Sequence, residues 1–249
     1  MTIGIIGAGS MARALALGWG EPAILSDGGS GRAAALAAEL GGTVADSNAE
    51  LAERADLVVL CHKPYQLGAV AGEVAGRADA VVSVLGATSL SSLRAALPGA
   101  EVARAMPNTP VELREGVTCL AEDPQADPTF TARVAELFAR LGRVVALPER
   151  LMDVATGLSG VVPAYVALIA EAQVDAGVRH GMTAAQATEL VGGALAGSAA
   201  LLLARGGDTL AMRREVASPG GSTARGLAAL ERAGLRTAFG NALDAVIAG

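Results

Sequence analysis

The 249-residue chain has few of the residues from which several kinds of site are built. Aromatic residues make up 2% of it, and it contains two histidines, two cysteines and one lysine. Two histidines are too few for a histidine-rich metal centre, so no metal is expected. Cys61 and Cys119 are too few for a disulfide framework and indicate a reducing compartment. Because the lone lysine is Lys63, no Schiff base can form on a lysine of the second half.

Basic charge and a leader segment are also missing. The net charge of −6 argues against a nucleic-acid partner, which requires a clustered basic surface. Met1 leads directly into an apolar run with no basic region before it, so a cytoplasmic protein is expected. Two long uncharged stretches, 157–170 and 190–204, are shorter than the roughly 20 apolar residues of a membrane span. They are typical of helices buried on nearly every side and predict a protein interface instead of a membrane.

Apolar runs of strand length alternate with helical patterns over the first 148 residues. The expected strands are residues 2–6, 23–26, 57–61, 80–85, 101–105, 117–121 and 144–147. The expected helices are one that ends near residue 19 and those over 32–40, 48–55, 91–97 and 129–141. Strands that alternate with helices indicate an α/β domain with a mostly parallel sheet.

The pattern changes after Pro148, and no convincing strand follows it. Helices are expected over residues 149–158, 163–181, 184–204, 209–216, 223–233 and 235–248. Gly181 ends the second of these helices, and Thr183 caps the third. We therefore expect two domains, a Rossmann-like domain over 1–148 and an all-α domain over 149–249.

Glycines follow the first expected strand in the pattern of a dinucleotide-binding turn. Gly7 permits the tight turn, Gly9 lets the backbone approach a pyrophosphate, and Ala12 is small enough for close packing of helix on strand. The start of the helix then offers free N–H groups to the phosphates. A glycine-rich turn without a ligand is the alternative, but the position between a strand and a helix favours the nucleotide site.

The end of the second strand carries residues that discriminate between nicotinamide cofactors. Asp27 lies where an acid would hold the ribose 2′-hydroxyl of NADH, whereas Ser26, Ser30 and Arg32 can hold the 2′-phosphate of NADPH. Asp27-Gly28 is also a common turn dipeptide, so a plain turn is an alternative role for Asp27. The choice between the two cofactors stays open.

Two further loops follow strands and are expected at the same crevice, because ligands bind outside the carboxyl ends of strands in an open α/β sheet. Lys63, in the loop His62-Lys63-Pro64, can meet a phosphate or a ribose. His62 taken alone is more typical of an ordinary loop histidine. Asn108 lies in the segment 105–110, whose two prolines hold the backbone extended.

The helical domain contains one candidate substrate loop, residues 218–223. Gly220 and Gly221 free its backbone, and Ser222 and Thr223 are expected to cap the helix that follows. Several N–H groups then point into one concavity at the start of a helix, which suits a small carboxylate. A plain helix cap with a flexible lead-in is the alternative.

These motifs, in this order, resemble the pyrroline-5-carboxylate reductase family over nearly the whole chain. The resemblance is carried by IGIIGAGSMA, VVLCHKPYQL, RAMPNTP with EGVTCL, LSGVVPAYVALIAEAQVDAGVRHGM and EVASPGGSTARGLAALE. It implies a Rossmann-like domain that binds NADPH or NADH, and a helical domain that forms an interleaved homodimer, with dimers assembling into decamers. It also implies reduction of a cyclic imine, 1-pyrroline-5-carboxylate, to L-proline.

The resemblance and the loops together predict the site residues. Those for the cofactor are Gly7, Gly9, Ser10, Met11, Ser26, Asp27, Arg32, Asn48, His62, Lys63, Pro64, Gly86 and Asn108. Those for the substrate are Val161, Val162, Ser218, Gly220, Gly221, Ser222 and Thr223. The resemblance implies that backbone N–H groups of 218–223 hold the substrate carboxylate. It also implies that the Thr223 hydroxyl bonds the ring nitrogen as a catalytic orienting group and proton relay.

Two departures from the family pattern bear on activity. Val161 and Val162 replace a serine and a glycine, so a hydroxyl is lost and a residue poorly suited to positive φ is introduced. The usual Ala-Gly after the fourth strand is Gly86-Ala87 here. The valines leave two alternatives: a reductase of a pyrroline-2- or piperideine-2-carboxylate, and a nucleotide-binding homologue without activity. A relative of the β-hydroxyacid dehydrogenases is disfavoured, because the helical domain lacks their catalytic lysine.

Overall fold

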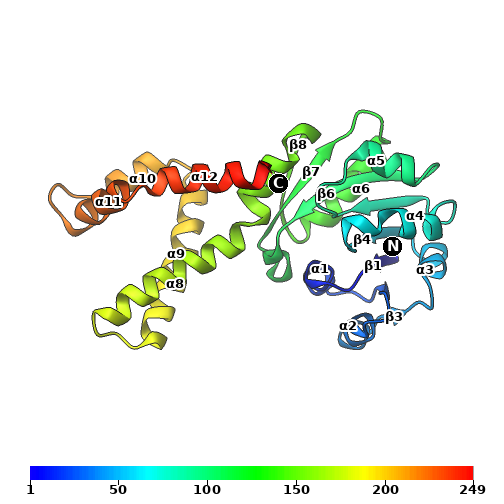
Figure 1. Ribbon diagram of the computed structural model, residues 1–249, viewed down its shortest axis with the longest axis horizontal. Coiled ribbons are helices and arrows are strands. Elements are labelled where there is room, and N and C mark those ends of the chain that lie inside the picture. Colours follow the sequence, from blue (N-terminus) through cyan, green and yellow to red (C-terminus); the bar gives the residue numbers. More distant parts are fainter. Residues whose placement is uncertain (249) are drawn as a thin grey trace. The chain divides into compact units, whose positions relative to one another are not determined.

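The computed structural model describes residues 1–248, so Gly249, the last residue of the predicted helical domain, lies outside the described residues. The chain divides into two compact units, Met1–Pro163 and Ala164–Gly249. All of the strands belong to the first unit, and the second consists of helices (Figure 1). This is the predicted fold class, an α/β domain followed by an all-α region.

The first unit is built on one sheet of eight strands in the order β3-β2-β1-β4-β5-β6-β7-β8. The strands are β1 (Ile3–Ile6), β2 (Ile24–Ser26), β3 (Thr43–Val44), β4 (Leu57–Leu60), β5 (Ala80–Ser83), β6 (Glu101–Pro107), β7 (Gly116–Glu122) and β8 (Gly142–Pro148). Neighbouring strands are parallel except β6 and β7. The mostly parallel sheet is therefore confirmed, and its order reverses between β1 and β4.

The segments between the strands are mainly helical. The helices are α1 (Ser10–Trp19), α2 (Arg32–Leu40), α3 (Asn48–Arg54), α4 (Leu67–Val74), α5 (Leu90–Ala96), α6 (Pro128–Ala139) and α7 (Met152–Ala155). Short 3-10 turns cover Pro64–Gln66, Thr109–Leu113 and Glu149–Leu151. Local chemistry sets several of these starts: the Ser47 hydroxyl caps α3, and the Asp127 carboxylate caps α6 ahead of Pro128.

Alternate residues of the strands feed two separate cores. Leu57 and Val59 of β4 pack in the core that α1, α2 and α6 cover, whereas Val58 and Leu60 pack in the core that α3, α4 and α5 cover. All four side chains are fully buried. Burying each such side chain contributes about 1.5–3 kcal/mol, so the runs of Val and Leu read from the sequence are explained by a sheet covered on both faces.

Trp19, the single tryptophan of the chain, joins two helices of the first unit. It ends α1, is buried, and its Nε1 donates to the Leu137 carbonyl of α6 over 3.1 Å. Its ring meets Phe138 edge-on, with the ring centroids 5.7 Å apart. This contact fixes the helix that starts at the glycine-rich turn.

The division between the units lies after Pro163, beyond the predicted boundary at Pro148. The intervening segment Glu149–Gly160 packs on the sheet, and Met152 within it is fully buried in the second core. The single helix predicted over 149–158 is instead a 3-10 turn, α7 and a π-helical turn over Thr156–Gly160. We call Glu149–Gly160 the connecting segment.

The helical region follows the predicted pattern closely. Its helices are α8 (Val162–Arg179), α9 (Ala184–Ala204), α10 (Thr209–Val216), α11 (Ser222–Arg232) and α12 (Leu235–Ala248). The predicted cap of α9 is confirmed, because the Thr183 hydroxyl accepts from the Gln186 N–H and the Gln186 side chain accepts from the Thr183 N–H. Gly181, between α8 and α9, has a φ of +95°.

The second unit has almost no core of its own. Within its described residues only Ala187 is buried, and leucines such as Leu168 and Leu190 are 65% and 60% exposed. Two helical stretches, Glu149–Arg179 and Ala184–Ala204, are long and apolar enough to cross a membrane by length and composition. The uncharged stretches 157–170 and 190–204 are parts of these longer helical stretches, so their shortness alone does not argue against a membrane span.

Candidate active site

The carboxyl ends of three strands meet at Gly7. Its N–H donates to the Ser26 carbonyl at the end of β2 over 2.9 Å. Its φ is +101°, and a Cβ added to it would lie 2.7 Å from the Cys61 carbonyl carbon, just beyond β4. Only glycine satisfies both conditions. The turn therefore sits where the strand order reverses, the usual place for a ligand in such a sheet.

Gly9 leaves open space in front of a helix start. A Cβ added to it would meet nothing within 4 Å. Gly9 is the cap residue of α1 and no side chain caps this end, while Ser10 is exposed and Met11 half-buried. An uncapped helix start beside open backbone fits a pyrophosphate, so the turn can hold a dinucleotide.

Asp27 is fixed at the end of β2 by its own loop. Its carboxylate accepts from the Ser30 hydroxyl over 2.6 Å, from the Gly29 N–H over 2.9 Å and from the Ala33 N–H over 3.0 Å. These hydrogen bonds, that of Ser30 first, lower the pKa of Asp27, so the group is ionised at neutral pH. Arg32 Nε donates to the same Ser30 hydroxyl over 3.0 Å.

Two more of the predicted cofactor residues are brought together beside this loop. The hydroxyl of Ser26 donates to Asn48 Oδ1 over 2.6 Å. Ser26 ends β2 and Asn48 is the first residue of α3, so their contact places the start of α3 at the same edge of the sheet.

His62 follows β4 and carries an unusual nitrogen. Its Nδ1 donates to the Lys63 carbonyl over 2.9 Å, and its Nε2 is buried without a hydrogen-bond partner among the described residues. Burial lowers the pKa of His62, so the neutral ring presents Nε2 as an acceptor. Lys63 and Pro64 are exposed at the start of the adjacent 3-10 turn.

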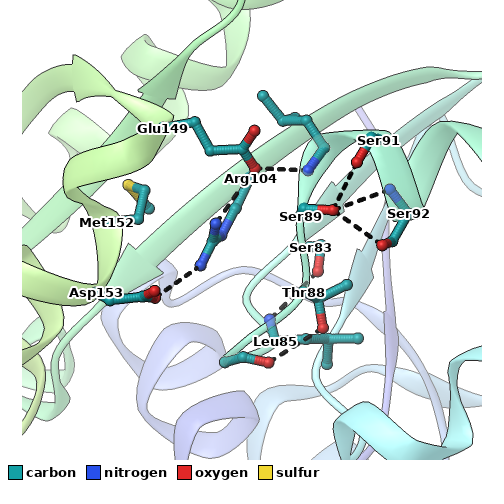
Figure 2. Close-up of polar contacts among 12 residues, drawn as sticks. Ser83, Leu85, Thr88, Ser89, Ser91, Ser92, Arg104, Glu149, Met152 and Asp153 are labelled. Atoms are coloured by element: carbon teal, nitrogen blue, oxygen red, sulfur yellow. Dashed lines mark hydrogen bonds and ion pairs between the residues drawn. The ribbon is translucent and has the colours of Figure 1, made fainter. Parts of the chain in front are cut away.

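The loop after β5 explains one departure from the family pattern. Gly86 and Ala87 are exposed in this loop, and Ala87 has a φ of +50°. The family's usual glycine stands at the position of Ala87, so the structure keeps a backbone conformation that favours glycine. The Thr88 hydroxyl donates to the Gly86 carbonyl over 3.1 Å and helps to hold the turn (Figure 2).

Asn108 is buried at the end of β6, and the fold uses most of its side chain. Its Oδ1 accepts from the Val117 N–H over 2.8 Å, and its Nδ2 donates to the Ser159 carbonyl over 3.3 Å. Asn108 therefore ties β6 to β7 and to the connecting segment. One proton of its amide remains for the predicted cofactor contact.

The two valines fit their backbone without strain. Val161 has φ −87° and ψ −16°, and Val162 is the first residue of α8. Neither has the positive φ for which a glycine would be needed. The expected backbone conflict at Val162 is therefore wrong, and the remaining difference from the family pattern is the volume and polarity of two half-buried side chains.

The candidate substrate loop lies between α10 and α11. Gly220 has a φ of +70°, and a Cβ added to Gly221 would lie 2.7 Å from the Ser218 hydroxyl oxygen. Gly221 is the cap residue of α11 and no side chain caps this helix. The prediction that Ser222 and Thr223 act as caps is wrong, because both lie inside the first turn, with exposed side chains.

This arrangement leaves the start of α11 open to a ligand. The Gly221 N–H is consumed in the turn, where it donates to the Ser218 carbonyl over 3.0 Å. The N–H groups of Ser222 and Thr223 belong to the uncapped first turn, which attracts anions. Arg225, which sequence reasoning missed, donates from Nη1 to the Gly220 carbonyl over 2.6 Å and adds positive charge. A positive charge this close to a helix start is unfavourable for the helix, so the position of Arg225 in the sequence was a sign that it serves a ligand.

Comparison with known proteins assigns both parts of the chain. The family model for pyrroline-5-carboxylate reductase dimerisation matches residues 149–248, and that for NADP oxidoreductase, coenzyme F420-dependent, matches residues 2–86. The pyrroline-5-carboxylate reductase of Synechocystis sp. is 37% identical over 204 residues, which are 81% of this chain and 76% of that protein. The chain belongs to the pyrroline-5-carboxylate reductase family. The resemblance read from the sequence motifs is thus confirmed.

Further members of the pyrroline-5-carboxylate reductase family cover nearly all of the chain. The reductase of Methanosarcina acetivorans is 33% identical over 252 residues, 97% of this chain and 93% of that protein. The solved structure of the Streptococcus pyogenes reductase has a TM-score of 0.90 and 31% identity, covering 99% of this chain and 96% of that one. The Plasmodium falciparum pyrroline carboxylate reductase, solved with NADP bound, has a TM-score of 0.86 and 27% identity, covering 99% and 95%.

Proposed function

We propose that this protein reduces 1-pyrroline-5-carboxylate to L-proline with NAD(P)H. The observation that carries the proposal is the pairing, in one chain of this family, of two sites of suitable chemistry. One is the Gly7–Gly9 turn with open space before an uncapped helix, which fits a dinucleotide. The other is the uncapped, glycine-led start of α11, which fits a carboxylate.

The reaction requires little acid–base catalysis by the protein. Reduction of the imine adds a hydride to the ring carbon and leaves the nitrogen with one more proton than the neutral imine. NAD(P)H, when bound, supplies the hydride. The Gly7–Met11 turn binds the phosphates, and Asp27 accepts hydrogen bonds from the ribose. Catalysis then consists mainly in holding two molecules in a productive orientation.

Residues of the 218–223 loop hold the substrate in this proposal. The N–H groups of Ser222 and Thr223 bind the carboxylate, with Arg225 adding favourable charge. The Thr223 hydroxyl bonds the ring nitrogen. Since the pKa of an alcohol is far from neutral, Thr223 orients the iminium and passes a proton; it is not a strong general acid.

We further propose that the helical unit is completed by a second copy of the chain. A unit whose described residues bury only Ala187 cannot supply a core by itself. The dimerisation family model covers both long apolar helices, α8 and α9, so a homodimer accounts for them without a membrane. The proposal also includes assembly of the dimers into a decamer. It places the protein in the cytoplasm, without a nucleic-acid partner.

NADH is the cofactor that the loop after β2 favours. The carboxylate of Asp27 is held there by three hydrogen bonds and stays ionised, so it accepts from a ribose hydroxyl and repels a 2′-phosphate. We expect kcat/KM to be higher with NADH than with NADPH. Asp27→Ser should shift the ratio toward NADPH at least tenfold, whereas an unchanged ratio would contradict this role.

The direct test is the initial rate with 1-pyrroline-5-carboxylate and each cofactor. Turnover is expected, and Thr223→Val should lower kcat by about 10–100-fold while Thr223→Ser keeps most of it, because serine retains the hydroxyl. Absence of turnover with both cofactors would overturn the proposed substrate. Equal loss in the valine and serine variants would overturn the role of the hydroxyl.

Val161 and Val162 favour one second candidate, reduction of another cyclic imino acid. Their branched side chains are half-buried where the family pattern has serine and glycine. A pocket with extra apolar volume selects among substrates by shape. A panel containing pyrroline-2-carboxylate and piperideine-2-carboxylate decides between the candidates, and Val161→Ser with Val162→Gly should move preference toward 1-pyrroline-5-carboxylate if this second activity dominates.

A further inference from the structure

A buried arginine lies in the middle of the sheet. Arg104 of β6 is 5% exposed, and it pairs in register with Ser83, the last residue of β5. Its strand neighbours Ala103 and Ala105 belong to the core under α1, α2 and α6, so its own side chain points to the opposite face. A guanidinium in such a place is stable only with anionic partners.

Both anionic partners of Arg104 come from the connecting segment. Nη1 of Arg104 lies 3.2 Å from Glu149 Oε1, and Nη2 lies 3.4 Å from Asp153 Oδ1 (Figure 2). The remaining nitrogen, Nε, is buried and has no partner within the described residues. Arg104 is thus committed to holding the connecting segment against β6.

Glu149 also binds the start of α5. The same oxygen, Oε1, accepts from the Leu90 N–H over 2.6 Å. Leu90 is the first residue of α5 and directly follows the loop that contains Gly86 and Ala87. One carboxylate oxygen therefore joins the cation of β6, the start of α5 and the connecting segment, as Figure 2 shows.

The two segments joined in this way carry predicted site residues. On one side, the loop 84–89 includes Gly86, a predicted cofactor contact, and the backbone of Ala87 is in the left-handed region. On the other side, the connecting segment ends directly before Val161 and Val162, predicted substrate contacts. It is held a second time where Asn108 Nδ2 donates to the Ser159 carbonyl.

We propose that Arg104, acting through Glu149, is a positioning residue that sets the loop 84–89 relative to the connecting segment, and so sets cofactor against substrate. The inference rests on the proposed function for its catalytic consequence. It does not rest on it for the structural one, because the hydrogen bond between Glu149 and the Leu90 N–H restrains the loop whatever the protein reduces.

Three variants and one matched control test the inference. Glu149→Ala removes both contacts of the carboxylate, Glu149→Gln keeps an oxygen for the Leu90 N–H, and Arg104→Met removes the cation. The control is Arg94→Met, which removes an ion pair between Arg94 of the same helix α5 and Asp123 without touching the connecting segment. Each protein is measured for kcat, KM for the imine, cofactor Kd by calorimetry, and amide hydrogen exchange over 85–92 without cofactor.

A positioning role predicts a split among these readouts. In Glu149→Ala and Arg104→Met, kcat falls at least tenfold while cofactor Kd changes less than threefold, and exchange over 85–92 accelerates at least tenfold in Glu149→Ala. Glu149→Gln recovers most of the exchange protection. Arg94→Met keeps kcat within twofold. The inference is overturned if Glu149→Ala and Arg94→Met have the same kcat and the same exchange rates. It is also overturned if kcat falls only in proportion to the fraction of the protein that still binds cofactor.

The exchange readout separates failure of this inference from failure of the proposed function. If the wild-type protein turns over no imine, the proposed function fails, and exchange alone decides the inference. Faster exchange over 85–92 in Glu149→Ala and not in Arg94→Met then supports the tie between loop and connecting segment. Unchanged exchange in Glu149→Ala overturns it.

Discussion

The two units of this chain draw on similarly apolar sequence and use it in opposite ways. The sheet unit buries its apolar residues in two cores, one on each face of eight strands. The helical unit buries one residue, Ala187, among those described, and presents leucines such as Leu190 and Leu203 to its surroundings. Apolar composition therefore does not show whether a segment forms a core or an interface. What decides is whether the same chain supplies a second layer to cover the apolar face. The sheet unit is complete in one chain, whereas the helical unit is completed by a second chain in the homodimer that we propose.

The most severe test of this comparison is a charge in the uncovered face. Leu190→Arg should abolish the homodimer at micromolar concentration and lower helix content, because an unpaired charge at an apolar interface costs several kcal/mol. Light scattering measures the first effect and circular dichroism the second. Leu113→Arg is the matched control, since Leu113 is a still more exposed leucine of the sheet unit and its replacement should leave assembly unchanged. A folded wild-type monomer would refute the comparison itself.

Next in size is a pair of glycine substitutions inside the sheet unit. Gly7→Ala should destabilise by about 2–5 kcal/mol, because its φ of +101° is unfavourable for alanine and its Cβ would meet the backbone beyond β4. Gly9→Ala should change stability by less than about 0.5 kcal/mol, since its Cβ meets nothing. Gly9→Ala should nevertheless weaken cofactor binding at least tenfold. Urea unfolding and calorimetry measure the two properties, and similar stability losses in both variants would argue against the assigned turn.

A smaller effect of opposite sign is expected in the loop after β5. Ala87→Gly should stabilise the protein by about 1 kcal/mol, because alanine at φ +50° is strained and glycine is not. Ala95→Gly in the regular helix α5 is the control and should destabilise by about 1 kcal/mol. Urea midpoints that move in the same direction for both variants would show that Ala87 carries no strain.

The smallest expected effect is a pH dependence from His62. Burial lowers its pKa below the ordinary 6.5, so the unfolded chain binds the proton more readily than the folded one. His62 therefore makes its full contribution to stability above about pH 6.5, and loses it as the pH falls from there toward the folded pKa. The drop in unfolding free energy between pH 7.5 and 5.5 should be smaller in His62→Gln. A drop of equal size would assign it to other groups.

Sequence reasoning succeeded where the pattern is local and long. The helix predicted over 184–204 has those limits in the structure, as does the helix over 32–40. β3, formed by Thr43 and Val44, was missed because two exposed residues show no apolar run. α4 was missed as well, since Gly68 and Gly72 lower its helix propensity. Short or glycine-bearing elements form because neighbours in space hold them, which a single sequence does not reveal.

The candidate site shows the same limit. Gly7 was predicted from a local pattern, a glycine between a strand and a helix, and its φ of +101° confirms that this turn requires glycine. The backbone at Gly9 does not require glycine, so its role at the cofactor site stays a prediction. Arg104 was not found, because its partners Glu149 and Asp153 are 45 and 49 residues away in the chain and belong to a different element. The reversed orientation of β7 beside β6 was equally hidden, since an apolar run carries no direction.

Fluorescence of the single tryptophan reports on one of the two units alone. Trp19 is enclosed in the sheet unit between α1 and α6, and the helical unit has no tryptophan. Its emission spectrum therefore shifts only when the sheet unit opens, whereas dichroism responds to helices in both. During chemical unfolding, the dichroism transition is expected to precede the emission shift and to depend on protein concentration. The two signals would then separate dissociation of the helical unit from unfolding of the sheet unit.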